Sequence, residues 1–439
     1  MAGEWIEVPF PEVIDFQEGP GILAKDFRND GVPLVRLSGL ERGGSVLSGC
    51  NYLDPEMVAR KWTHFALATG DVLLSTSASL GRIAVVGEDA VGAIPYTGII
   101  RMRPRDGRLI APFLRYLLEG PDFQQQAEMV GVGSVIRHFG PMHLRQMSVK
   151  LPPPDDQRAI AHILGTLDDK IELNRRMSQT LEAMARALFK AWFVDFEPVR
   201  AKMEGRWRRG ESLPGLPAHL YDLFPDRLVD SELGEIPEGW GVGTLGDVST
   251  LNPEVWTQET RPTRINYVDL SNTKWGRIET VISYEATKAP SRAQRVLRLG
   301  DTIVGTVRPA NGSYAFISQP GLTGSTGFAV LRPQRLDYAE FVYLAATMAD
   351  NIETLAHLAN GAAYPAVRPQ LVAATPIVRP PDKVLVRFSQ TAGSMLEKIA
   401  QNERQSRTLV ALRDTLLPKL ISGALRVTDA ERFLEERGL

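Results

Sequence analysis

An apolar stripe with a period of 3.5 residues occurs twice in this chain, and its two copies lie 228 residues apart. The stripe positions are Ile160, Leu164, Leu167, Ile171, Asn174, Ser178, Leu181, Ala185 and Leu188, and then Phe388, Ala392, Met395, Ile399, Asn402, Ser406, Leu409, Arg413 and Leu416. A 3.5-residue period is typical of a helix that packs along its length against another helix. The sequence therefore predicts two long helices in matching positions of a repeat.

Both stripes are interrupted by asparagine and then by serine at the same two places. A buried amide in an apolar seam fixes register, because a slipped pairing would leave it without a hydrogen-bond partner. We therefore predict that the two helices pack on each other, with these polar residues near the middle of the seam. The alternative is that each stripe packs separately on its own globular domain. The seam is predicted to contain Leu167, Ile171, Asn174, Ser178, Leu181, Met395, Ile399, Asn402, Ser406 and Leu409.

The repeat extends beyond the stripes, with small shifts that are expected where loops accept insertions. Its order is kept from one copy to the other. The matching pairs are Gly70-Asp71 with Gly300-Asp301, Thr97-Gly98 with Thr326-Gly327, Arg103-Pro104 with Arg332-Pro333, and Gly133-Ser134 with Gly361-Ala362. The chain therefore contains two copies of one kind of domain, each followed by a long helix.

Short β-like runs separated by glycines, with one helix near 112–129 and another near 338–358, make each domain mixed. The predicted class is α+β, with two mixed domains separated by two long, coiled-coil-like helices and related by an internal pseudo-two-fold repeat. Each helix of about 38 residues would span on the order of 57 Å. Arg413 and Pro418 lie in the second helix, which is therefore expected to be less regular than the first or to end early. The predicted segments are a first domain at 1–151, a first helix at 152–198, an irregular connector without a later counterpart at 199–235, a second domain at 236–378, a second helix at 379–424 and a charged tail at 425–439.

Composition limits the possible settings of the chain. The single cysteine, Cys50, excludes an internal disulfide and favours a reducing, cytoplasmic setting. Residues Met1 to Phe10 do not resemble an export signal, and no apolar run approaches the roughly 18 residues needed to span a bilayer, so we expect neither export nor membrane insertion. The formal charge of −2 by itself weighs against nucleic-acid binding, because such domains often carry a basic excess.

Motifs of known chemistry are missing or out of context. The GxGxxG pattern at Gly241 to Gly246 follows a loop instead of a strand, so it does not predict a dinucleotide site. The sequence contains no phosphate-binding loop, no pocket motif of an amine methyltransferase and no pair of histidines with the spacing of metal ligands. We therefore predict no catalytic residues, no metal and no cofactor bound by this chain.

Polar and basic loops occur at matching places in the two copies. Arginine can bind guanine bidentately, asparagine can bind adenine, and serine or threonine can bind phosphates. The alternative is that these loops are ordinary solvated turns. The candidate DNA-binding residues are Ser75, Ser77, Arg82, Tyr96, Thr97, Arg101, Ser134, Arg137 and His138 in the first copy, and Asn272, Lys274, Arg308, Asn311, Tyr364 and Arg368 in the second.

Three stretches carry a family resemblance. They are Leu151-Pro-Pro-Pro-Asp-Asp-Gln-Arg-Ala-Ile160, then the helix segments 167–176 and 181–196, and the connector from Leu220 to Trp240. On these residues, and on the alternation of domain and helix over its full length, the chain resembles the specificity subunit of type I restriction-modification systems.

The resemblance implies that each domain reads one half of a split double-stranded DNA target, while the two long helices run antiparallel, hold the domains apart and set the gap. It also implies that the helices dock two methylation subunits, which carry S-adenosylmethionine, and that restriction subunits complete the complex. A non-catalytic protein-interaction scaffold is the alternative. If the chain is a specificity subunit, its near-neutral charge would mean that partner subunits supply much of the phosphate contact.

Overall fold

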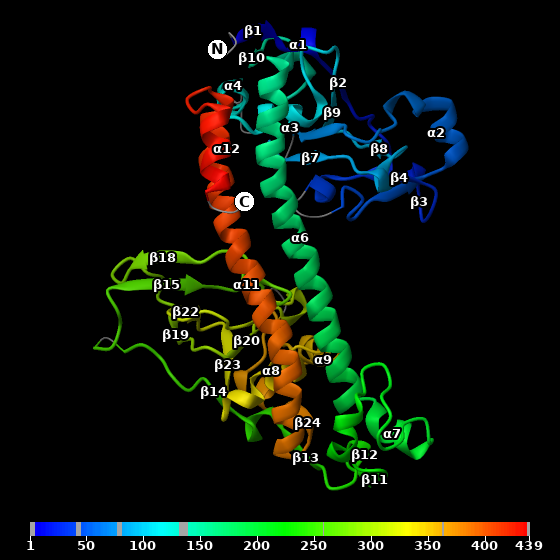
Figure 1. The fold of residues 1–439 in the computed structure, drawn as a ribbon, viewed down its shortest axis with the longest axis vertical. Helices are drawn as coiled ribbons and strands as arrows, with labels where there is room; N and C mark the ends of the chain where they lie inside the picture. Colours follow the sequence, from blue (N-terminus) through cyan, green and yellow to red (C-terminus); the bar gives the residue numbers. More distant parts are fainter. Residues whose placement is uncertain are drawn as a thin grey trace. The chain divides into compact units, whose positions relative to one another are not determined.

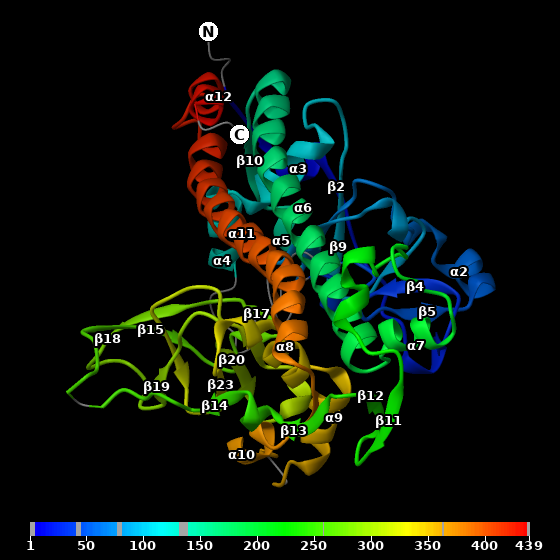
Figure 2. The same cartoon turned by 60° about the horizontal axis from the view of Figure 1, so that its bottom comes forward.

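The structure, a computed structural model, describes residues 5–40, 45–76, 81–130, 139–257, 259–361 and 364–436. Its elements are drawn in Figures 1 and 2. The chain divides into two compact units, one formed by Met1–Arg175 with Glu403–Leu439 and the other by Arg176–Asn402. Each unit has a large apolar core of its own.

The first unit contains two four-stranded sheets and a two-stranded ladder that joins the start of its mixed domain to the end. The ladder pairs β1 (Ile6–Pro9) antiparallel with β10 (Ser148–Leu151). The first sheet has the order β2 (Ile14–Glu18), β9 (Ile99–Pro104), β6 (Val72–Ser75) and β7 (Ile83–Val85). The second has the order β3 (Phe27–Arg28), β5 (Asn51–Leu53), β4 (Val32–Val35) and β8 (Ile94–Pro95), with β4 and β8 parallel.

The second unit repeats the ladder and the first sheet of this plan, and its other sheet differs in the edge strands. Its ladder pairs β13 (Gly241–Thr244) with β24 (Pro376–Arg379). One sheet has the order β14 (Ser249–Leu251), β23 (Phe328–Pro333), β20 (Thr302–Gly305) and β21 (Tyr314–Phe316). The other has the order β18 (Ile282–Glu285), β15 (Arg264–Val268), β22 (Leu322–Ser325) and β19 (Ala293–Val296), with β15 and β22 parallel. A small hairpin of β16 (Thr273–Lys274) and β17 (Arg277–Ile278) is added.

The helices that follow the sheets differ from the prediction of one helix in each domain. Two helices take the place of each predicted one: α3 (Ala111–Glu119) and α4 (Pro121–Val130) in the first domain, and α8 (Ala339–Ala346) and α9 (Ala349–Leu358) in the second. The break in the first unit falls at Gly120, whose extended backbone (ψ 152°) stops α3 before Pro121 begins α4. In the second unit Met348 is extended in the same way (ψ 144°).

The two long helices, α6 (Pro154–Phe193) and α11 (Asp382–Ile421), each contain 40 residues and are separated by the 228-residue repeat. The expectation that α11 ends early is wrong, because it continues through Pro418 to Ile421. A proline inside a helix costs about 3 kcal/mol. Leu416, Leu420 and Ile421 are buried in the core of the first unit, and burying each such side chain contributes about 1.5–3 kcal/mol, which outweighs that cost.

Polar residues of the stripes meet across the helix pair within each unit. In the first unit Asn174 Nδ2 donates to Ser406 Oγ at 3.3 Å and to Gln405 Oε1 at 3.0 Å. In the second unit Asn402 Nδ2 donates to Ser178 Oγ at 3.3 Å. The two sets are reciprocal, and rising numbers on α6 face falling numbers on α11. The helices therefore run antiparallel, and the predicted α+β class with an internal repeat is confirmed.

Arg413, which interrupts the second stripe, does not disturb α11. Its side chain is 5% exposed, and its guanidinium donates to Asp168 of α6 at 2.8 Å. Asp168 also pairs with Arg115 at 3.1 Å and accepts the Tyr116 hydroxyl at 3.0 Å, both from α3. The carboxylate therefore holds the mixed domain and both long helices of the first unit together.

The connector and the tail are more ordered than predicted. The connector contains α7 (Glu197–Met203) and a hairpin of β11 (Leu228–Ser231) and β12 (Gly234–Pro237), and it buries Trp207 at 1% exposure. The tail contains α12 (Val427–Glu435), which buries Ala430 and Leu434 in the core of the first unit. Because α7 and α12 each follow a long helix within six residues, the start of the connector does have a counterpart.

Asp168→Asn is expected to lower the free energy of unfolding of the full chain by about 3 kcal/mol or more, because it leaves buried Arg413 with an incompletely compensated charge. Asp414→Asn is the matched control. Asp414 is the other partner of Arg413 but is 55% exposed, so its loss should cost less than about 1 kcal/mol. Urea unfolding of both variants measures the difference, and equal costs would contradict the role given to Asp168.

Candidate nucleic-acid interface

The matching Gly-Asp and Arg-Pro motifs form the same buried ion pair in both units. Asp71 is 3% exposed and accepts from Arg103, with Nη2 at 2.7 Å. Asp301 is fully buried and accepts from Arg332 Nε and Nη2 at 2.9 and 3.0 Å. Each aspartate also accepts a backbone N–H three residues upstream, from Ala68 at 2.7 Å and from Arg298 at 2.8 Å. These residues hold the sheet and its preceding turn, so their repetition reflects structure.

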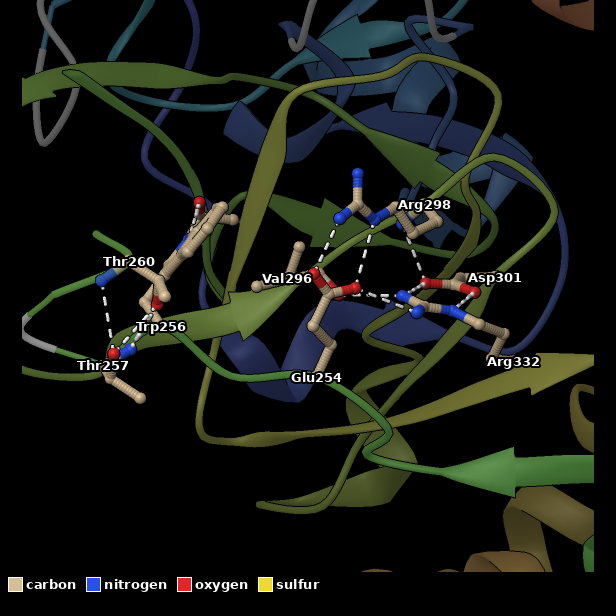
Figure 3. Close-up of polar contacts among 9 residues, drawn as sticks. Glu254, Trp256, Thr257, Thr260, Val296, Arg298, Asp301 and Arg332 are labelled. Atoms are coloured by element: carbon tan, nitrogen blue, oxygen red, sulfur yellow. Dashed lines mark hydrogen bonds and ion pairs between the residues drawn. The ribbon is translucent and has the colours of Figure 1, made fainter. Parts of the chain in front are cut away.

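In the second unit this pair is extended to the surface by Glu254. Figure 3 shows the Glu254 carboxylate between the guanidinium groups of Arg298 and Arg332. It accepts from Arg298 at 2.6 Å and from Arg332 at 3.0 Å. The hydrogen bond from Arg298, with help from Arg332, lowers the pKa of Glu254 below its ordinary value of 4.5. These arginines are already paired, so they are poor candidates for phosphate contacts.

Two first-unit candidates lie in the interior, which corrects their prediction as DNA contacts. Ser75 is fully buried on β6, and its hydroxyl accepts the Arg82 N–H at 2.9 Å. Arg101 is 6% exposed and pairs with Asp15 at 3.0 Å, and burial lowers its pKa. Loop composition could not reveal this, because both residues belong to strands that face the core.

The other first-unit candidates are divided by exposure. Tyr96 is half-buried, donates its hydroxyl to Ile22 O at 3.2 Å and has the Arg36 guanidinium 4.2 Å from its ring. Arg82 and Thr97 are exposed. The candidates Ser77, Ser134, Arg137 and His138 lie outside the residues that the structure describes.

The second-unit candidates are mostly exposed and lie on three neighbouring loops. Lys274 is on the β16–β17 hairpin, Arg308 and Asn311 flank the turn after β20, and Tyr364 precedes α10 (Pro369–Ala373). All four side chains are exposed, as is Arg368 at the start of α10, whereas Asn272 is half-buried.

Backbone hydrogen bonds tie the three loops to one another. Trp275 N–H donates to Gly312 O at 2.6 Å, and Arg308 N–H donates to Pro365 O at 2.7 Å. The Arg308 guanidinium lies 4.7 Å from the centre of the Tyr364 ring. We call Lys274, Trp275, Arg308, Asn311 and Tyr364 the second-unit loop cluster. It combines cations, an amide and exposed aromatic rings, which are the groups that contact phosphates and bases.

Trp275 is the residue of this cluster that sequence reasoning did not select. Its side chain is 58% exposed, and one face of the indole packs on Gly312, where a Cβ would come within 2.6 Å of the ring. Trp275 and Arg308 both have positive φ angles, 48° and 49°. Strained backbone of this kind persists where function favours it. In the sequence, only the Trp-Gly pair could have indicated this residue, because such a pair fits a tight hairpin turn; Gly276 also has a positive φ angle (86°).

The described residues contain no group of three or more histidine, cysteine, aspartate or glutamate side chains that could hold a metal ion. Within the same ranges of the chain, no helix is both long and apolar enough to cross a membrane.

The chain is similar to known proteins along most of its length. Residues 3–183 match the family model described as "Type I restriction modification DNA specificity domain". The chain is 24% identical to the type I restriction enzyme MjaIX specificity subunit of Methanocaldococcus jannaschii, over 82% of this chain and 78% of that protein. It is 25% identical to the HindI specificity subunit of Haemophilus influenzae, over 82% and 87%.

A crystal structure of a type I restriction-modification S subunit from M. genitalium shares the fold, with a TM-score of 0.55 and 15% identity over 95% of this chain and 96% of that one. Duplicated mixed domains on paired long helices, with exposed loops able to contact bases, define a non-catalytic DNA sequence-recognition subunit. These matches support a specificity subunit of a type I restriction-modification system. These relatives do not favour the alternative of an interaction scaffold.

Glu254→Gln is expected to destabilise the chain at neutral pH by on the order of 1 kcal/mol, because the amide cannot replace the charge between Arg298 and Arg332. The folded-state pKa of Glu254 is lowered, so its stabilisation is present above about pH 4.5 and is lost as the pH falls below that value. The difference in unfolding free energy between wild type and variant should therefore shrink in acid. Exposed Glu279→Gln is the control, and a gap that stays constant down to pH 3 would contradict this assignment.

Proposed function

We propose that residues 1–151 and 236–378 each read one half of a bipartite DNA target, and that α6 and α11 fix the gap between the halves. One observation carries this proposal. The two copies share a sheet plan and a buried Asp–Arg ion pair, but their exposed loops differ. A shared frame with differing loops suits two readers that recognise different half-sites.

The helices suit the task of a spacer because their length and register are both fixed. At 40 residues each, they span about 60 Å. The reciprocal Asn–Ser hydrogen bonds penalise a slip in register, because it would leave buried amides unpaired. A spacer of this kind keeps the gap independent of what either domain reads.

The contact with phosphates is proposed to come largely from partner subunits. The formal charge is −2, and many arginines, such as Arg298, Arg332 and Arg335, are already paired with acidic side chains. We propose that two methylation subunits, which carry S-adenosylmethionine, assemble on this chain in the cytoplasm, away from membranes, and that restriction subunits complete the complex. This division of roles leaves base edges to the loops of this chain.

Exchange of residues 1–151 for those of a related specificity subunit is expected to change one half of the methylated target and to leave the gap and the other half unchanged. Mapping of methylated adenines in cells that express the full system measures all three. The reciprocal exchange of residues 236–378 is the control and should change only the other half. An exchange that alters both halves, or the gap, would contradict the modular arrangement.

Trp275→Ala is expected to weaken binding of the assembled complex to its target by about tenfold, because an exposed aromatic ring that stacks on a base contributes about 1–3 kcal/mol. Lys274→Ala should weaken binding to all sequences alike and reduce the salt slope by about one. Leu336→Ala, which is 74% exposed and outside the cluster, is the control. Fluorescence anisotropy at several salt concentrations separates these effects, and unchanged affinity of both cluster variants would exclude this surface.

A further inference from the structure

An apolar cavity of about 360 Å³ opens within the second unit, where the end of α6 meets α8, α9 and β24. Its walls include Phe193, Phe341, Ala345, Met348, Asn351 and Ile377. A cavity of this size, with mostly apolar walls and few polar groups, is typical of a binding site. None of these residues belongs to the second-unit loop cluster.

The repeat provides an internal reference for this cavity. Leu117, Asp122, Phe123, Gln126, Val149 and Ile421 surround the equivalent place in the first unit, and each lies 228 residues from a residue that lines the cavity of the second. The equivalent space there is only about 10 Å³. The two copies therefore share the frame of the cavity, and the first copy has filled it with its own side chains.

The ring of Phe123 fills the space in the first unit. It is 2% exposed and stacks on Phe10 with the ring centres 5.7 Å apart. Its counterpart is Asn351, whose amide donates to Ala346 O at 2.7 Å and accepts from the Thr375 hydroxyl at 3.0 Å. Those bonds hold the Asn351 amide between the end of α8 and the residue before β24, and Asn351 has no aromatic ring with which to fill the space.

A second side-chain bridge, one helical turn further along the helix, is missing from the second copy. In the first unit the Gln126 amide bonds both backbone groups of Ser148, at 3.0 and 3.2 Å. The counterparts are Thr354, which is shorter, and Pro376, which has no N–H to donate. At Thr354 and Pro376, no such bridge links α9 to β24 along this side of the cavity.

A positive charge is the second group that the first copy supplies and the second lacks. Lys150 Nζ lies 3.7 Å from the Asp122 carboxylate in the first unit. The corresponding residues are Val378 and Asp350, which both line the cavity. Asp350 is exposed and forms no ion pair with any residue that the structure describes. The open site therefore presents an unpaired carboxylate beside a vacant ring-sized space.

The rim of the cavity is apolar as well. Val194, just past the end of α6, is 40% exposed, and Leu233, in the β11–β12 turn, is 44% exposed. Exposed apolar side chains around an apolar cavity are typical of a surface that another protein covers. A free aromatic molecule would fill the cavity but would leave this rim in water.

We propose that this cavity binds an aromatic side chain of a partner polypeptide, with a lysine or arginine beside that side chain pairing with Asp350. The partner supplies in the second unit the two groups that Phe123 and Lys150 supply in the first. The inference rests on the proposed function only in that the partner is one of the subunits with which this chain assembles. It adds a residue-level anchor point that is separate from DNA reading.

The test fills the cavity from within. Asn351→Phe restores the ring of the first copy, and Ala345→Leu restores the side chain found at Leu117. Each variant is expected to weaken the affinity of the full chain for its purified partner subunits about tenfold or more, measured by calorimetry without DNA, because a central aromatic anchor dominates such interfaces. Asp350→Asn should weaken it less and reduce its salt dependence. Leu358→Phe, at an exposed position of α9 outside the cavity, is the control and should change nothing.

A second measurement identifies the occupant and does not depend on affinity. Leu233→p-benzoylphenylalanine is expected to crosslink, in the purified complex, to a partner segment that contains an aromatic residue next to a lysine or arginine, and Asn351→Phe should abolish that crosslink. A crosslink to a second copy of this chain, or one that survives Asn351→Phe, would overturn the inference. So would unchanged partner affinity in both cavity-filling variants, provided that their thermal unfolding shows that they are folded. That result would leave DNA recognition intact, whereas failure of the full chain to bind any partner subunit would overturn the proposed assembly itself.

Discussion

Reciprocal hydrogen bonds between asparagine and serine, from Asn174 to Ser406 in one unit and from Asn402 to Ser178 in the other, are the constraint on which the structure depends. An apolar seam alone tolerates sliding, because one leucine contact can replace another. A buried amide does not, because a shift would leave it without a partner. The two sets are related by the repeat, so they also place the two mixed domains at equivalent positions along their helices. Each unit therefore carries the same constraint on the register of its own helix pair.

The mixed domains divide stability and recognition between different residues. The pairs Asp71–Arg103 and Asp301–Arg332 hold the strands and the turn before β6 and β20 in the same way in both copies. The exposed loops beyond those strands differ, and in the second unit they bring aromatic rings and cations together around Trp275 and Arg308. Because the buried frame is repeated and the exposed surface differs, one fold can recognise two sequences.

The repeat also shows where the two units are not equivalent. The first closes the space beside α4 with Phe123 and Lys150, and the second leaves it open beside Asn351 and Asp350. Likewise Arg413 is balanced by Asp168 in the first unit, whereas the corresponding positions in the second, Ala185 and Leu396, are apolar and buried. Duplication preserved the backbone plan while side chains at single positions took on different tasks.

The sequence by itself determined the two long helices, their antiparallel pairing, the polar positions in their seam and the repeated domain, because helical periodicity and internal repetition are properties of the chain read along its length. Tertiary structure decided which polar residues face the solvent. Ser75 and Arg101 proved to be buried and Trp275 to be exposed, which their local sequences do not reveal. The burial of α12 and the open cavity likewise depend on contacts between residues far apart in the chain. Local pattern fixes the type of element, whereas burial, and with it the candidate site, is set by what packs against that element.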